Sequence, residues 1–108
     1  MNLLMKVLRM VTKSLEEIKK IMKDHEKILS EKFKVKSIMI FGSYARNEQK
    51  EGSDVDIIVD FSKPIGLEFV DLKEYLEKIL GMKVDLVTPR AIREKMRKSI
   101  LKEAVKIK

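Results

Sequence analysis

Residues 38–59 read IMIFGSYARNEQKEGSDVDIIV, a polar segment between two runs of apolar, largely β-branched residues. Such runs are typical of buried strands, and we predict strands over 35–41 and 54–61. The polar segment opens with Gly42-Ser43 and closes, after ten intervening residues, with Asp54-Val55-Asp56. Because alternate side chains of a strand lie on the same face, Asp54 and Asp56 are expected to project together. Two such carboxylates repel each other, and a divalent cation such as Mg²⁺ or a shared proton would neutralise them.

The segment after the first predicted strand has the features of a phosphate-binding turn. Gly42 has no side chain to block close approach to the backbone, and Ser43 begins a predicted short helix over 43–47. Free N–H groups at a helix start favour a phosphate, and Arg46 adds a planar, charged fork for phosphate oxygens. Tyr44 lies inside this turn, where it either stacks near a nucleotide or packs beneath the turn. The sequence therefore predicts a site for a metal–triphosphate.

The periodicity of the remaining chain predicts an α+β fold. Ser14 opens a capping box for an amphipathic helix whose apolar positions are Leu15, Ile18, Met22, His25 and Leu29. The same spacing continues backwards, so either one helix covers 2–32 or a separate helix precedes Ser14. We favour the second, with a helical N-terminal extension over 1–13 and one domain over 14–108.

The C-terminal half predicts a helix over 67–80 ended by Gly81, a third strand over 83–87, and a final helix. Thr88-Pro89 would open that last helix, with Thr88 as the cap. Its apolar face is expected to contain Ile92, Met96, Ile100 and Ala104. The predicted architecture is a small mixed three-stranded sheet packed with about four to five helices.

The spacing of the motifs resembles that of the nucleotidyltransferase superfamily that includes DNA polymerase β. The pattern is Gly-Ser, ten residues, Asp-x-Asp, and a single Asp on a later strand, here Asp85 in KVDLVT. In more detail, the chain is similar to the minimal nucleotidyltransferases, small antitoxin partners of HEPN-domain toxins, from about Leu15 to the C-terminus. Asn47 departs from the pattern, because members often carry glycine after the Ala-Arg pair.

The resemblance implies a polymerase β-like palm that transfers AMP from ATP to a tyrosine of a HEPN toxin, with two Mg²⁺ ions. Its implied metal-binding and catalytic residues are Asp54, Asp56 and Asp85. Its implied nucleotide-binding residues are Gly42, Ser43, Tyr44 and Arg46. Two alternatives stay open: a toxin-binding antitoxin without catalysis, and nucleotide addition to an RNA end. Homo-oligomers and hetero-oligomers also stay open.

Composition bounds the class of protein. The chain has 108 residues, enough for one domain, with 44% hydrophobic and 38% charged residues and no cysteine. No apolar run is long enough to cross a bilayer, and we expect a cytoplasmic protein without a membrane partner. The stretch 89–108 carries eight Lys or Arg against two Glu, which is +6 of the formal +7. Such a basic helix can simply be a solvated face, or it can bind a partner, for which we favour an acidic protein over RNA.

Overall fold

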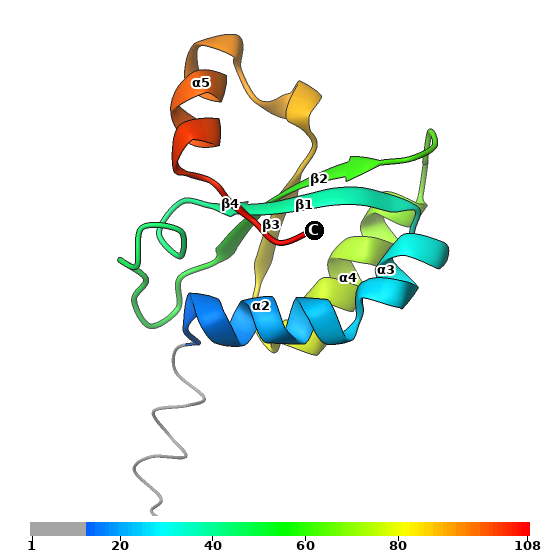
Figure 1. Cartoon of the computed structure of the whole chain (residues 1–108), viewed down its shortest axis with the longest axis horizontal. Helices are drawn as coiled ribbons and strands as arrows, with labels where there is room; N and C mark the ends of the chain where they lie inside the picture. The colour runs from blue at the N-terminus through cyan, green and yellow to red at the C-terminus, as the bar shows by residue number, and fades with distance from the viewer. Residues whose placement is uncertain (1–12) are drawn as a thin grey trace, which may run out of the picture.

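The chain folds into one mixed sheet with helices on both faces (Figure 1). A computed structural model describes residues 13–108, so the predicted helix over 1–13 lies outside the described residues except for Lys13. In the described part, no helix is long and apolar enough to span a bilayer. The elements, in chain order, are α2 (Leu15–Asp24), α3 (Glu26–Glu31), β1 (Val35–Phe41), β2 (Val55–Phe61), α4 (Glu68–Leu80), β3 (Val84–Val87), the 3-10 helix η1 (Pro89–Ala91), α5 (Glu94–Glu103) and β4 (Val105–Lys106).

The strand order is β3-β2-β1-β4, with β2 parallel to β3 and the other two pairs antiparallel. The three predicted strands are confirmed within a residue at each end, but the predicted total of three is wrong. The described sheet has a fourth strand, because Val105 pairs with Ile40 and Lys106 with Met39. A two-residue strand carries no readable alternation, so only the return of the chain to β1 creates it.

Helices α2, α3 and α4 cover one face of the sheet and form the core with it (Figure 1). Ser14 caps α2 as predicted, and its hydroxyl accepts the Glu17 N–H at 3.1 Å. The predicted continuous helix is divided at His25, whose φ of −108° and ψ of 12° leave the helical region. The core consists of side chains from these three helices, from β1, β2 and β3, and from two loop positions: Ile18, Met22, Leu29, Phe33, Val35, Ile38, Ile40, Tyr44, Val55, Ile57, Val59, Leu72, Leu76, Leu80, Val84 and Leu86.

Among residues 13–108, the elements that cover the opposite face of the sheet are the C-terminal ones (Figure 1). Thr88 and Pro89 start η1 rather than a long helix, and the chain is extended at Ile92 before α5 begins. The Arg97 guanidinium stabilises this interruption between η1 and α5, because its Nη2 donates to Pro89 O at 3.2 Å and to Ile92 O at 3.4 Å. The prediction that Ile92 and Met96 lie on one buried face of the last helix is therefore wrong. Ile92 is buried but precedes α5, and Met96 belongs to α5 but is 54% exposed.

Candidate active site

Asp56 and Asp85 lie side by side because their strands are parallel and in register. Asp56 of β2 pairs with Asp85 of β3, between the aligned pairs Val55–Val84 and Ile57–Leu86. Those neighbouring side chains are buried in the core with α2, α3 and α4. Since strand side chains alternate, both carboxylates lie on the opposite face of the sheet.

The surroundings of the Asp56 carboxyl disfavour its ionised form. Its pKa is raised from 3.8 to about 6. Burial is the largest cause, followed by the charge of Asp85, a hydrogen bond with Asp85, and the charge of Asp54. Only the positive charge of Arg46 opposes these effects. A half-buried carboxyl among like charges is a common feature of sites that bind cations or move protons.

Asp54 was predicted to be the first residue of the second strand, but it lies just before that strand. β2 begins at Val55, so Asp54 precedes the ladder, and it is exposed. Its charge still raises the pKa of both Asp56 and Tyr44, which places its carboxylate close to both groups. Within residues 13–108, the three aspartates do not form a closed group of three ligands for one ion. The pair Asp56 and Asp85 nevertheless fits Mg²⁺, which usually binds through one or two carboxylates together with substrate phosphates and water.

Gly42 brings the turn after β1, residues 42–47, directly against Asp56. Its φ is +72°, a conformation that L side chains rarely adopt. A Cβ at this position would overlap Asp56 Oδ2 and lie 3.1 Å from Asp56 Cγ. Both the backbone conformation and the space therefore require glycine, and the turn and the carboxylates form one site.

The predicted short helix over 43–47 is instead a series of tight turns. Arg46 N–H donates to Gly42 O at 3.2 Å, Asn47 N–H to Tyr44 O at 3.3 Å, and Glu48 N–H to Ser43 O at 2.8 Å. Within residues 13–108, the N–H groups of Ser43, Tyr44 and Ala45 have no hydrogen-bond acceptor. Three consecutive free donors next to a glycine can cradle an anion without a helix.

Asn47, which departs from the nucleotidyltransferase pattern that the sequence resembles, has a backbone conformation that glycine also adopts. Its φ is +58°, in the left-handed region. Asn tolerates that region better than most residues with a Cβ. The departure from the family pattern is therefore conservative in backbone terms.

Tyr44 packs beneath the turn, which was one of the two alternatives for it. Its side chain is only 2% exposed and belongs to the hydrophobic core. Burial, and then the charge of Asp54, raises the pKa of its hydroxyl above the ordinary value of 10.0. A ring this buried offers little surface to a nucleotide base.

Arg46 is held at the edge of the site by two carboxylates. Its Nε donates to Glu48 Oε2 at 3.2 Å, and its Nη1 donates to Glu103 Oε2 at 3.4 Å. These two bonds raise its pKa. Sequence reasoning missed Glu48 and Glu103, because neither stands at a motif position and Glu103 is 57 residues from Arg46.

The chain matches the nucleotidyltransferase domain over residues 15–107. It belongs to the nucleotidyltransferase domain family. A relative from Methanocaldococcus jannaschii, assigned as a protein adenylyltransferase, is 53% identical over 92 residues, covering 84% of this chain and 94% of the relative. The protein adenylyltransferase MntA of Thermococcus cleftensis is 50% identical over 93 residues, covering 85% and 94% respectively.

Solved structures agree with this membership. One assigned as a minimal nucleotidyltransferase superposes with a TM-score of 0.74 at 31% identity, covering 86% of this chain and 95% of that one. A toxin–antitoxin crystal structure with AMP-PNP has a TM-score of 0.62 at 24% identity, covering 87% and 72%, and so shows the shared fold. The nucleotidyltransferase fold and enzyme class expected from the sequence are confirmed.

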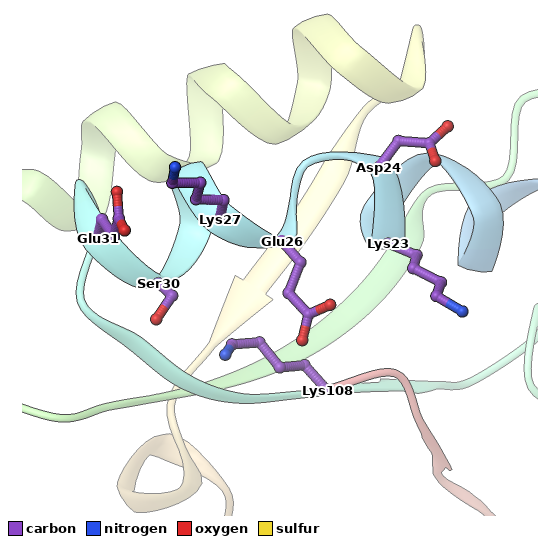
Figure 2. A pocket seen from close by; sticks show the side chains of 7 residues that line it. All are labelled: Lys23, Asp24, Glu26, Lys27, Ser30, Glu31 and Lys108. Carbon is purple, nitrogen blue, oxygen red and sulfur yellow. The ribbon is translucent and has the colours of Figure 1, made fainter.

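Three surface grooves formed by the described residues contain neither the turn nor the three aspartates. Figure 2 shows one of about 430 Å³, between α2, α3 and the last residue of the chain. Its lining is charged but contains no residue of the turn and none of the three aspartates: Lys23, Asp24, Glu26, Lys27, Ser30, Glu31 and Lys108.

Proposed function

We propose that this nucleotidyltransferase transfers AMP from ATP to a hydroxyl group of a partner protein. The observation that carries the proposal is the contact between the Gly42 turn and Asp56, with Asp85 in register beside it. Free N–H groups of the turn suit the phosphates of a nucleotide, and the adjacent carboxylates suit Mg²⁺. A phosphate cradle and a cation site in contact are what nucleotidyl transfer requires.

Asp54, Asp56 and Asp85 would hold two Mg²⁺ ions. Bound there, the ions would supply charge stabilisation for the attacking and leaving oxygens. The N–H groups of Ser43, Tyr44 and Ala45 would bind the β- and γ-phosphates, and Arg46 would orient them from the rim.

The reaction exchanges one P–O bond for another and transfers one proton. The acceptor oxygen attacks the α-phosphorus, the bond from that phosphorus to the β-bridging oxygen breaks, and diphosphate leaves with the electron pair. The acceptor proton passes to the Asp85 carboxylate, the exposed member of the pair. The products are AMP-protein and diphosphate.

The acceptor that we propose is a tyrosine of a HEPN-domain toxin. Two observations support a protein acceptor: the relatives that are half identical carry the name protein adenylyltransferase, and a protein of the same fold was crystallised as a toxin–antitoxin complex with AMP-PNP. AMP on the toxin would make this chain an antitoxin that acts by modification.

The test is incubation with ATP labelled at the α-phosphate, Mg²⁺ and the partner toxin, followed by gel electrophoresis and mass spectrometry. We expect label on a toxin tyrosine, and none after addition of EDTA or in Asp56→Asn. Toxin neutralised equally well without label would replace the proposal with the non-catalytic antitoxin. Label found on added RNA and not on protein would replace it with RNA-end addition.

A further inference from the structure

The Arg46 guanidinium connects the nucleotide turn to the far end of the chain. Glu48 lies two residues further along the same loop, whereas Glu103 is the last residue of α5. Arg46 Nε bonds Glu48 and Arg46 Nη1 bonds Glu103, at 3.2 and 3.4 Å. A guanidinium has five N–H donors in a planar fork, and Nη2 has no acceptor within residues 13–108. Two nitrogens are therefore fixed, while the third stays available to a ligand.

The backbone places Glu103 at this point. Ala104 ends α5 in an extended conformation, and its N–H donates to Ile100 O at 2.9 Å. The next residue, Val105, already pairs with Ile40, which lies two residues before Gly42. The pairing of β4 with β1 thus places the C-terminal end of α5 beside the turn that begins at Gly42.

The energetics argue against a role in stability. The side chains of Arg46 and Glu103 are 44% and 49% exposed. Exposed ion pairs contribute little to folding, because water screens them and holding two long side chains in one geometry costs entropy. The same contacts can still strengthen ligand binding. A guanidinium that is already oriented loses less conformational entropy when a ligand binds.

We propose that Glu103 is a positioning residue that, together with Glu48, holds the Arg46 guanidinium so that its Nη2 meets the phosphates of the bound nucleotide. This inference rests on the proposed function, in which the Gly42–Arg46 turn binds a triphosphate. If Glu103 has this role, the affinity for the nucleotide depends on the position of α5. A partner that shifts α5 would then alter the affinity for ATP.

The test is a double-mutant cycle measured by calorimetric titration with MgATP. Glu103→Gln is expected to raise the Kd for MgATP about threefold, within the range of an exposed ion pair, and to leave the Kd for adenosine unchanged. In an Arg46→Ala background, the same substitution should have no effect. Glu103→Asp should recover part of the affinity, because the carboxylate remains.

Glu94→Gln is the matched control, since it removes one exposed carboxylate from the first turn of the same helix. It should leave the Kd for MgATP unchanged. An equal loss of affinity from Glu103→Gln with and without Arg46, or no loss at all, would overturn the positioning role. A wild-type protein that binds MgATP and shows the coupling but labels no protein would overturn the proposed acceptor and leave the positioning role intact.

Discussion

At the scale of single residues, the raised pKa of Asp56 affects the stability of the fold. Its pKa of about 6 lies above the ordinary 3.8, so the folded protein binds the proton more tightly than the unfolded chain. The resulting stability is fully present below about pH 4 and is lost as the pH rises through about 6. At neutral pH without divalent cations, the ionised carboxylate therefore destabilises the fold.

We predict that Asp56→Asn abolishes nucleotidyl transfer and raises the melting temperature at pH 7 in EDTA. Scanning calorimetry between pH 4 and 7 should show a difference from wild type that grows with pH. Asp24→Asn is the control, since it removes an exposed carboxylate from α2. A difference in melting temperature that shrinks with rising pH would contradict the assigned direction of the Asp56 shift.

Gly42 and Gly52 allow the contact with Asp56 to be separated from backbone strain. Both have positive φ, +72° and +81°, but a Cβ at Gly52 would meet nothing within 4 Å. Alanine in the left-handed region costs about 1–2 kcal/mol. We predict that Gly52→Ala loses about that much stability and keeps transfer activity, whereas Gly42→Ala loses more stability and most of the activity.

Urea unfolding and the α-phosphate label assay would measure the two effects. If Gly42→Ala retained activity like Gly52→Ala, the close approach of the turn to Asp56 would not matter for the reaction.

At the scale of elements, the turn after β1 keeps its shape without a helix. Five residues are too few to form a stable helix by themselves, because nucleation is costly. The left-handed Asn47 then ends any helical path. The donors that a helix start would offer are nevertheless present as the free N–H groups of the turn.

Asn47→Val should destabilise the protein by about 1–2 kcal/mol and weaken MgATP binding, because a β-branched residue is strained at φ +58°. Asn47→Gly should preserve both. The matched control is Lys34→Val, which has the same φ of +58° at the other end of β1 and should cost stability without affecting MgATP. Equal losses of MgATP affinity in both valine variants would assign the effect to global stability rather than to the turn.

At the scale of the whole molecule, the C-terminal segment presents a basic surface. α5 has no buried residue, and Arg93, Lys95, Arg97, Lys98 and Lys102 are exposed along this part of the chain. Met96 and Leu101 are 54% and 44% exposed among them. Exposed apolar side chains surrounded by positive charge fit an acidic protein surface better than an RNA strand, which favours stacking aromatics.

We therefore predict that salt affects partner binding mainly through the association rate. Kinetic binding assays with the toxin across a salt series should show a nearly constant dissociation rate. RNA would behave differently, with a log–log slope of about −0.7 for each phosphate contacted. A steep equilibrium slope with RNA together with no toxin binding would contradict the protein partnership.

Much of this protein could be predicted from local sequence, because local physics controls those features. Apolar runs on either side of a turn predicted β1 and β2, and the helix-ending Gly81 has the left-handed conformation expected for a cap. Strand alternation predicted that Asp54 and Asp56 project together, and the resemblance to the nucleotidyltransferases added Asp85. Capping, alternation and glycine geometry depend on neighbouring residues, so a linear sequence is enough to reveal them.

Other features were decided only by tertiary structure. The register of β2 on β3 brings Asp56 beside Asp85, the core takes in Tyr44, and the return of β4 to β1 places Glu103 on Arg46. The interruption at Ile92 also needs the sheet beneath it. Each of these depends on burial and pairing between segments far apart in the chain, where packing free energy overrides local preference. Sequence therefore predicted the candidate groups of the site, and the fold determined which of them touch.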